Sequence, residues 1–335
     1  MKVCVYGLGA VGGLIAGKLR SAGVDVCAVA RGRVLEHVNR AGLALTSAGH
    51  TEHASLRVAE NPAALGAQDL VVIAVKATGI GDVARRIAPL LGEHTVVLSA
   101  MNGVPWWFYH GIREVGPGRR IETVDPAGAI SAAIAPERVV GCVSNLSAST
   151  PAPGEVAYLP SPRLTIGEPG GGAASPRCRA IIEMLQASGF TVLASESIQQ
   201  SIWFKLWGNM TVNPISALTG ATGDRIVGDP LVRAFMSRCM VEARVLGERI
   251  GLPIDSTPDA RHEVTARLGA FRTSMLQDVQ AGKATELDAL VGAVRELARH
   301  EGVETPDIDA LFGLARLQAQ TLGLYPRLDA NPAGA

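Results

Sequence analysis

The sequence predicts an α/β N-terminal domain followed by an all-α C-terminal domain. The first observation is that residues 3–30 contain a short apolar strand, a glycine-rich turn, a helix and a second strand in succession. Further apolar runs of strand length then alternate with helical segments as far as Ser195. Beyond Ser195 the pattern is helical almost without interruption to about Leu324. We therefore expect the domain boundary near Ser195.

The glycine-rich turn has the spacing Gly7-x-Gly9-x-x-Gly12. In a βαβ unit the first glycine permits the tight turn, the second lets a pyrophosphate approach the backbone, and the third lets the helix pack on the strand. Free N–H groups at the helix start then bind the phosphates. The alternative is a glycine-rich turn that binds nothing, and the strand before it and the helix after it argue against that. We predict a Rossmann-type dinucleotide site with the cofactor-binding residues Gly7, Leu8, Gly9, Ala10, Val11 and Gly12.

The residues at the end of the second strand indicate whether the cofactor is NAD or NADP. An NAD enzyme usually has an acid there, which accepts a hydrogen bond from the ribose 2′-OH. This chain has Arg31 and Arg33 and no acid. Guanidinium groups suit a 2′-phosphate, so we expect NADPH or NADP, with Arg31 as the contact. For Arg33 the alternative is that it lies in an ordinary solvated turn.

Two later strands deliver polar residues to the same edge of the predicted sheet. The apolar run 69–76 reads as a central parallel strand that ends at Lys76, and the strand 95–99 leads to Asn102. The carboxyl edge of such a sheet faces the ligand crevice. We expect Lys76 and Asn102 to contact cofactor or substrate; a solvated lysine and a turn-forming Asn-Gly pair are the alternatives. The aromatic run 106–109 that follows reads as a helix start on the sheet or as an apolar wall over the site.

From residue 121 to 168 the apolar runs are short and separated by Pro and Gly. The runs 139–143, 156–158 and 164–166 are expected to add antiparallel strands to the sheet. We place an NADP-binding Rossmann-type domain at 1–195, an all-helical substrate and catalytic domain at 196–328, and a frayed tail at 329–335.

One helix of the second half combines apolar and polar residues in a regular pattern. Lys205, Asn209 and Asn213 are spaced i, i+4 and i+8, so they share one helix face. A cation and two amides on a buried face are costly unless they meet a polar group. A solvent-facing stripe is the alternative, but the neighbouring Trp203 and Trp207 suggest burial. We expect a functional face on a helix that Pro214 kinks or ends.

A second polar cluster comprises residues 274–278 and 285–288. Thr285 is placed to cap the helix that begins there, with Glu286 in its first turn. Asp288 could likewise be only a helix-start acid, and Ser274 could be only a cap.

Composition excludes several classes of function. Lys plus Arg and Asp plus Glu both number 31 in 335 residues, so nothing indicates a nucleic acid or an anionic membrane as partner. The N-terminus enters a strand at once, as in a cytoplasmic protein without a signal peptide, and no apolar run reaches transmembrane length. The five cysteines are scattered without metal spacing and read as reduced thiols, so no metal is expected. A homodimer is compatible with the sequence, and the helical domain would carry its interface.

Together these motifs resemble the ketopantoate reductase (2-dehydropantoate 2-reductase) family over residues 1 to about 315. The resemblance implies a Rossmann-type NADPH domain with an all-helical domain, which act on a small 2-oxo acid. It implies that Lys205 is the catalytic lysine and that Glu286 helps to organise ligand and lysine. It also implies that Lys76 and Asn102 lie near nicotinamide and substrate. The expected substrate contacts are Asn102, Asn209, Asn213 and Ser274.

The chain departs from the family pattern at three places that would line the pocket. Met101 stands where the family usually has Gln, Phe271 where it often has Asn, and Val291 in place of an Asn. These changes affect substrate choice more than reductase chemistry. The expected reaction is NADPH-dependent reduction of 2-dehydropantoate to pantoate, as part of pantothenate biosynthesis. The alternatives are reduction of another branched 2-oxo acid, a β-hydroxyacid dehydrogenase, and a non-catalytic NADP-binding sensor.

Overall fold

The computed structural model describes residues 1–116 and 118–326. The chain forms two compact units, each of which is described by itself. The first comprises Met1–Arg120 and Asp125–Ile202, and the second comprises Ile121–Val124 and the chain from Trp203 onward. The predicted tail at 329–335 lies outside the described residues.

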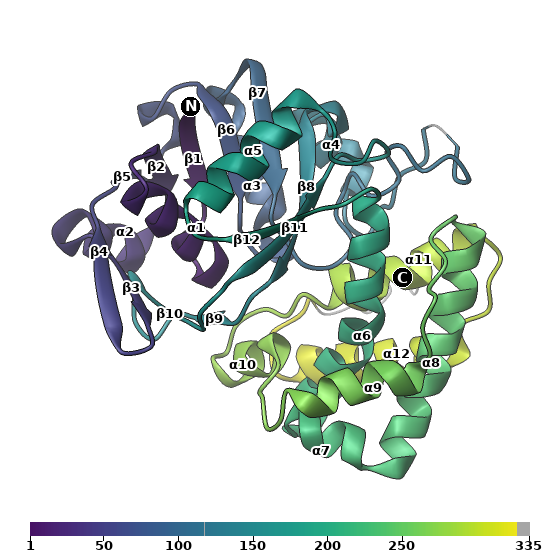
Figure 1. Ribbon diagram of the computed structural model, residues 1–335. Coiled ribbons are helices and arrows are strands. Elements are labelled where there is room, and N and C mark those ends of the chain that lie inside the picture. Colours follow the sequence, from purple (N-terminus) through teal and green to yellow (C-terminus); the bar gives the residue numbers. More distant parts are fainter. Residues whose placement is uncertain (117, 327–335) are drawn as a thin grey trace, which may run out of the picture. The chain divides into compact units, whose positions relative to one another are not determined.

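A large mixed sheet forms the centre of the first unit, with the strand order β12-β11-β8-β7-β6-β1-β2-β5 (Figure 1). Its middle strands are short and apolar, and most of their side chains are fully buried. The strands are β1 (Lys2–Tyr6), β2 (Asp25–Val29), β5 (Arg57–Ala59), β6 (Gln68–Ile73), β7 (Leu91–Ser99), β8 (Val139–Asn145), β11 (Arg163–Gly167) and β12 (Thr191–Ala194).

The sheet reverses its direction of winding between β1 and β6. Strand β1 pairs in parallel with β2 on one side and with β6 on the other, so that Val5 lies between Ala28 and Val72. The connection from β1 leads to β2 and the connection from β6 leads to β7, in opposite directions across the sheet. Right-handed crossovers therefore place α1 (Ala10–Ser21) and α3 (Ile80–Arg86) on opposite faces. Ligands bind outside the carboxyl ends of the strands at such a reversal.

The predicted added strands form, but only one of them joins the large sheet in the expected direction. Strand β11 pairs antiparallel with β8, as expected, whereas β8 pairs in parallel with β7. The run 156–158 forms β10 (Glu155–Tyr158), which belongs to a different sheet. The apolar pattern of a short strand shows that it is buried, but it does not specify the neighbouring strand.

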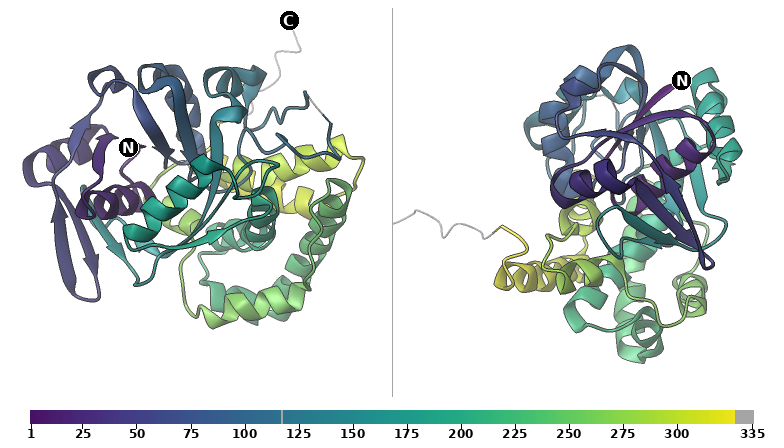
Figure 2. Two further views of the ribbon diagram at one scale, coloured as in Figure 1. Left: turned by 45° about the horizontal axis from the view of Figure 1, so that its top comes forward. Right: turned by 90° about the vertical axis from the view of Figure 1, so that its left-hand side faces the viewer.

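That second sheet has the order β4-β3-β10-β9 and packs on the side of α1 that faces away from the large sheet (Figures 1 and 2). Two glycines of α1 allow this close packing, since a Cβ at Gly13 would lie 2.7 Å from Val156 and one at Gly17 would lie 2.5 Å from Leu45. Its remaining strands are β3 (Leu43–Ser47), β4 (His50–Ala54) and β9 (Ala148–Ser149).

The helices of the first unit complete its layers. Leu14 and Leu19 of α1 and Ile181 of α5 (Pro176–Ala187) share one hydrophobic core with the sheet, so α1 and α5 cover the same face. The other helices are α2 (Gly32–Ala41), α4 (Ala129–Ala133) and the short 3₁₀ turns η1 (Pro62–Ala64), η2 (Ala77–Gly79), η3 (Ala88–Leu90), η4 (Pro126–Gly128) and η5 (Pro136–Arg138).

The aromatic run 106–109 forms a series of turns, so the expected helix start there is wrong. All four side chains are buried, and the Trp106 indole donates to the carbonyl oxygen of Ile134 at 3.1 Å. Trp107 packs where a Cβ at Gly141 would lie 2.7 Å from its ring. The four rings are thus buried by tertiary packing while the backbone forms turns.

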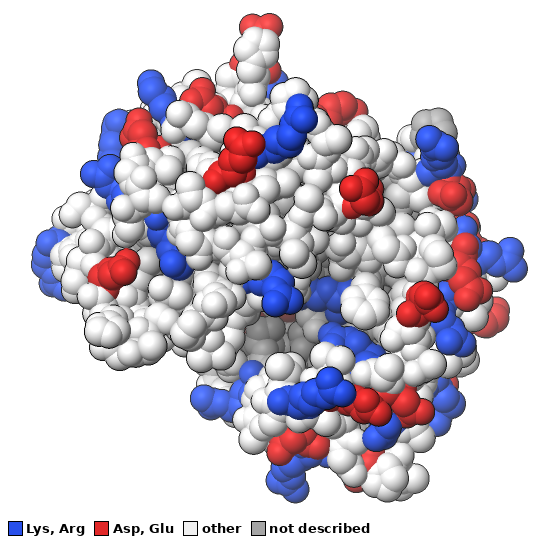
Figure 3. Space-filling model, viewed as in Figure 1, with Lys and Arg blue, Asp and Glu red and all other residues white. Residues whose placement is uncertain are grey.

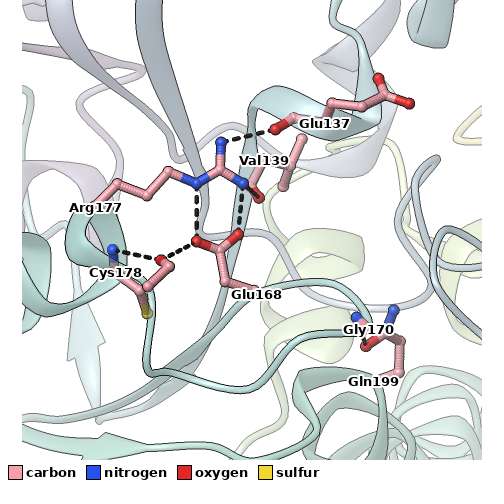
Figure 4. Close-up of polar contacts among 8 residues, drawn as sticks. Glu137, Val139, Glu168, Gly170, Arg177, Cys178 and Gln199 are labelled. Atoms are coloured by element: carbon pink, nitrogen blue, oxygen red, sulfur yellow. Dashed lines mark hydrogen bonds and ion pairs between the residues drawn. The ribbon is translucent and has the colours of Figure 1, made fainter.

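A partly buried ion pair between Arg177 and Glu168 connects the start of α5 to the sheet (Figure 4). The Arg177 guanidinium donates to both carboxylate oxygens of Glu168 and to the carbonyl oxygen of Glu137 at 2.7 Å. The Ser175 hydroxyl donates to the same carboxylate and also accepts from the backbone of Cys178. Burial opposes ionisation of Glu168, but the hydrogen bonds from Arg177 and Ser175 outweigh it, so its pKa lies below the usual value.

The second unit is helical. Its elements are α6 (Ile198–Thr219, which begins in the first unit), α7 (Gly223–Gly228), α8 (Pro230–Arg249), α9 (Pro258–Arg267), α10 (Ser274–Gln280), a π-helical segment (Asp288–Gly292), α11 (Ala293–His300) and α12 (Pro306–Thr321). The segment 121–124 is anchored to α11, because the Glu296 carboxylate accepts from the backbone of Glu122 at 2.6 Å and of Thr123 at 2.7 Å.

Helix α6 continues for five residues beyond Pro214, so of the two expected effects of this proline, a kink or an end, the end is wrong. An interior proline removes one backbone hydrogen bond and costs about 3 kcal/mol. The large side chains of Trp207, Met210 and Ile215 around it are each at most 5% exposed, and full burial of such a side chain contributes about 1.5–3 kcal/mol. The Trp207 indole also donates to the Met240 carbonyl oxygen of α8 at 2.6 Å. Packing on both sides of Pro214 therefore holds the helix together.

The surface agrees with the balanced composition. Figure 3 shows basic and acidic side chains scattered over the visible face, in places side by side. In the described ranges, no helix combines the length and the apolar character needed to cross a bilayer. The five cysteines form no disulfide.

Candidate cofactor and substrate sites

The glycine turn has the geometry that a dinucleotide needs. Gly7 has φ +100°, a conformation that favours glycine, and its N–H donates to the Val29 carbonyl oxygen at 2.9 Å. A Cβ at Gly12 would lie 1.9 Å from the carbonyl oxygen of Gly7, so helix and turn touch there. A Cβ at Gly9 would meet nothing within 4 Å. The first and third glycines are therefore required by the fold, and the second faces open space.

The start of α1 faces this space. Gly9 is the N-cap and has no side chain to satisfy the first-turn amides, and the first turn holds no acid. The first N–H groups of a helix have no partner within it, so those of Ala10 and Val11 are placed to bind an anion. Leu8 is buried and belongs to the hydrophobic core, so only its backbone lies in the turn.

The loop after β6 packs directly on the glycine turn. The Ala74 N–H donates to the Tyr6 carbonyl oxygen at 3.1 Å, and a Cβ at Gly7 would lie 2.8 Å from Val75. Lys76 follows as an exposed residue, three positions beyond the end of the strand. On the next strand the Ala100 N–H donates to the Ile73 carbonyl oxygen at 2.9 Å. This pairing places Lys76 and the half-buried Asn102 after neighbouring strands, at the same carboxyl edge as the turn.

Arg31 lies at the same edge, among further charged residues that the sequence reasoning missed. Its guanidinium is 4.0 Å from the Asp82 carboxylate, which also lies 3.3 Å from Arg85 and 3.7 Å from Arg86. The Arg31 side chain is 75% exposed. Arg33 is also exposed. The i, i+3 and i+4 spacing of Asp82, Arg85 and Arg86 could have predicted that these three side chains interact on one helix. Nothing in the sequence, however, places α3 beside Arg31.

The second unit carries the polar face predicted on α6. Lys205 and Asn209 are half-buried, and Asn213 is 7% exposed. Trp203 and Trp207 beside them are each 1% exposed, so the helix is buried as expected. The three polar side chains thus lie on one face of a helix whose tryptophans are packed, although Phe204 beside Lys205 is 44% exposed.

The second polar cluster differs from the expectation at its helix starts. The cap of α10 is Thr273, whose side chain accepts from the Leu276 N–H at 3.2 Å, and Ser274 is the exposed first residue of the helix. Thr285 does not cap a helix, because its buried hydroxyl has no partner among the described residues. Glu286 next to it is 7% exposed.

A π-helical segment follows this cluster. It starts at Asp288, whose carboxylate accepts from the Tyr325 hydroxyl at 2.6 Å. Burial raises the pKa of Asp288, and the hydrogen bond from Tyr325 opposes that effect. Asp288 is therefore more than a solvated helix-start acid. Segments of π-helix are frequent at functional sites.

The three departures from the family pattern have definite places. Phe271 packs over Gly223, where a Cβ would lie 2.1 Å from its ring. Val291 is fully buried in the π-helical segment. Met101 is half-buried, one residue before Asn102.

A glycine turn of dinucleotide-binding geometry at the reversal of the large sheet, in one chain with a helical unit that carries a lysine–asparagine face, is typical of two-domain oxidoreductases that use a nicotinamide cofactor. Residues 3–171 match the family described as Ketopantoate reductase PanE/ApbA, and residues 197–319 match its C-terminal domain. The chain therefore belongs to the ketopantoate reductase family.

Its relatives cover it almost entirely. A 2-dehydropantoate 2-reductase of Mesorhizobium japonicum is 42% identical over 97% of this chain and 100% of its own length. A solved structure from Ralstonia solanacearum, described as a candidate ketopantoate reductase, is 49% identical with a TM-score of 0.92 and covers 97% of this chain and 99% of its own. A D-mandelate dehydrogenase solved with NADH and anilino(oxo)acetate shares the fold, at 19% identity, a TM-score of 0.83 and coverage of 97% and 100%.

Proposed function

We propose that this protein reduces the C2 carbonyl of 2-dehydropantoate to give pantoate, with NADPH as reductant. The observation that carries the proposal is the position of Lys205, half-buried on one helix face with Asn209 and Asn213. The name of the Mesorhizobium japonicum relative, 42% identical over the whole domain pair, supports the substrate. Arg31, with no acid after β2, supports NADPH over NADH.

Bound NADPH would supply the hydride, and the chain's residues would do the rest. The turn Gly7–Gly12 and the start of α1 would hold the pyrophosphate, and Lys76 and Asn102 would lie near the nicotinamide end. As hydride arrives, the substrate carbonyl oxygen gains negative charge. The Lys205 ammonium would donate a hydrogen bond to that oxygen and then its proton, as electrostatic stabiliser and general acid.

The other polar residues would fix the substrate and the lysine. Burial of Lys205 would favour its neutral form. The carboxylate of Glu286, which is 7% exposed, would favour the charged form and so keep Lys205 protonated. Asn209, Asn213 and Ser274 would hold the hydroxyl and carboxylate groups, which sets the angle at which the carbonyl meets the hydride donor.

The test is the variant Lys205→Ala, with Lys283→Ala as control because Lys283 is an exposed lysine of the same unit. Loss of the general acid should lower kcat by a factor on the order of 10² or more. NADPH affinity, measured by fluorescence titration, should not change. Turnover of Lys205→Ala close to that of the wild type would refute the role of this lysine.

A second candidate is the reduction of another branched 2-oxo acid. The observations that favour it are the bulky Phe271 packed on Gly223 and the apolar Val291, both in place of polar family residues. A panel of 2-oxo acids, followed by NADPH absorbance, separates the two candidates. A kcat/KM at least tenfold higher for another acid than for 2-dehydropantoate would favour the second.

A further inference from the structure

An arginine outside the predicted site packs directly on the backbone of α6. Arg261 lies on α9, and its guanidinium contacts α6 at Gly208. A Cβ at that glycine would lie 2.5 Å from Nε, 2.6 Å from Nη2 and 2.8 Å from Cζ of Arg261. A glycine inside a helix costs about 1 kcal/mol relative to alanine. Gly208 therefore provides the space that this guanidinium occupies.

The contact lies beside Lys205, on the side of that residue that faces away from Asn209 and Asn213 around the helix. Gly208 precedes Asn209 by one residue and follows Lys205 by three. At about 100° per residue, Gly208 and Lys205 are about 60° apart around the helix. Side chains three positions apart have Cβ atoms about 5–6 Å apart. The Arg261 guanidinium thus occupies the space next to Lys205 that a side chain at position 208 would otherwise fill.

No acid accompanies this guanidinium in the described part of the chain. Its Nε is buried and has no hydrogen-bond partner there. The nearby acids serve other arginines: Asp259 pairs with Arg233 at 2.7 Å, and Glu263 pairs with Arg267 at 3.6 Å. Burial lowers the pKa of Arg261, and no neighbouring carboxylate raises it again.

The guanidinium is only partly out of water, because Arg261 is half-buried and its Nε is the atom buried without a partner. Even partial burial of a charge is costly, and an anion that accepts from Arg261 would offset that cost. A guanidinium matches a carboxylate with two parallel hydrogen bonds, which an ammonium group cannot do. A 2-oxo acid has a carboxylate on the carbon next to its carbonyl carbon. A lysine can donate to the carbonyl oxygen of such a molecule, and an arginine beside that lysine can donate to its carboxylate.

We propose that Arg261 binds the carboxylate of the 2-oxo acid substrate and thereby selects for acids over neutral carbonyl compounds. The inference deepens the proposed function and rests on it for the position of Lys205. Arg261 would supply the positive charge that pairs with the carboxylate. The side chains of Asn209, Asn213 and Ser274 are neutral and cannot supply it. Gly208 is required because any larger residue would displace the guanidinium.

The test compares two ligands that differ in the carboxylate. Pantoate has it, whereas pantolactone has the same carbon skeleton and carries no charge. Their dissociation constants are measured by calorimetry on the full chain loaded with NADP⁺, for the wild type, Arg261→Met and Arg261→Lys. The control is Arg267→Met, which removes an exposed arginine of the same helix.

Arg261→Met should weaken pantoate about 30-fold or more, because truncating one partner of a buried charge pair costs at least that much. Pantolactone binding should stay within a factor of about three, Arg261→Lys should be intermediate for pantoate, and Arg267→Met should match the wild type. In turnover, Arg261→Met should raise KM for 2-dehydropantoate more than it lowers kcat.

Several results would overturn the inference. Pantoate affinity unchanged in a folded Arg261→Met protein is one, and an equal loss for acid and lactone is another, since it would mean a purely structural role. If Arg261→Met does not fold, Gly208→Ala keeps the cation but displaces it, and should again weaken pantoate selectively; unchanged binding there also rejects the idea.

Failure of the proposed function gives a different pattern. If the wild type reduces and binds another 2-oxo acid but not 2-dehydropantoate, the proposed substrate is wrong, and the Arg261 variants are tested with that acid. A wild-type protein that binds no 2-oxo or 2-hydroxy acid overturns both proposals.

Discussion

Two alanine substitutions in the glycine turn should separate its structural role from its binding role. Gly12→Ala introduces a Cβ 1.9 Å from the Gly7 carbonyl oxygen and 2.9 Å from Ala74. The closest atom belongs to the backbone, so the turn or the helix must move. Overpacking of this kind costs about 1–3 kcal/mol or more, and alanine regains about 1 kcal/mol of helix propensity. Because the 1.9 Å contact is with backbone, we take the upper end of that range and expect a net destabilisation of about 2 kcal/mol. It would be seen as a lower urea midpoint by circular dichroism without cofactor.

Gly9→Ala should give the opposite result. Its Cβ would meet no atom of the protein within 4 Å, and the backbone of Gly9, at φ −76° and ψ −166°, is accessible to alanine. Stability should therefore change by less than about 1 kcal/mol, the cost of a poorer N-cap residue. The added methyl group would occupy the space proposed for the pyrophosphate, so NADPH affinity should fall at least about tenfold, or about 1.4 kcal/mol.

Calorimetric titration of NADPH into both variants completes the comparison. Wild-type affinity in Gly9→Ala would refute the placement of the pyrophosphate at this residue. Wild-type stability in Gly12→Ala would refute the reasoning from the close contact between helix and turn.

Two further predictions concern charge. Arg31→Ala should weaken NADPH about tenfold and leave NADH unchanged, because only NADPH offers a phosphate for a charge-assisted hydrogen bond. Arg33→Ala should have little effect; equal losses for both cofactors in Arg31→Ala would argue against 2′-phosphate recognition. Glu168→Gln should lower the free energy of unfolding by about 1–3 kcal/mol at pH 7, since it weakens the hydrogen bonds with Arg177. Because the folded pKa of Glu168 is lowered, this difference should be complete above the unfolded value of about 4.3 and shrink as pH falls through the folded pKa, as urea titrations at several pH values would show. A difference independent of pH would exclude the ionised carboxylate as its cause.

The parts of the fold that follow from local pattern could be predicted from the sequence. The unit β1–α1–β2 and its glycines form as expected, because strand burial, turn conformation and helix start are all local requirements. The polar face of α6 was equally visible, since its period is that of one helix.

Features that depend on distant packing could not be predicted in this way. The strand neighbours of β8 and β10 follow from the sheet as a whole. The cap at Thr273 instead of Ser274 is a local ambiguity, because both residues can cap a helix and the helix start shifts by one residue. Arg261 gave no signal, because an arginine in a polar helix is ordinary until its neighbour at Gly208 is known.

The anchoring of residues 121–124 to Glu296 has a consequence for any attempt to express the halves separately. A fragment that starts at Trp203 would lack the two backbone amides that this carboxylate accepts from. A buried carboxylate deprived of its donors costs about 1–3 kcal/mol or more. A recombinant helical half should therefore include this short stretch, joined by a linker, if it is to be stable on its own.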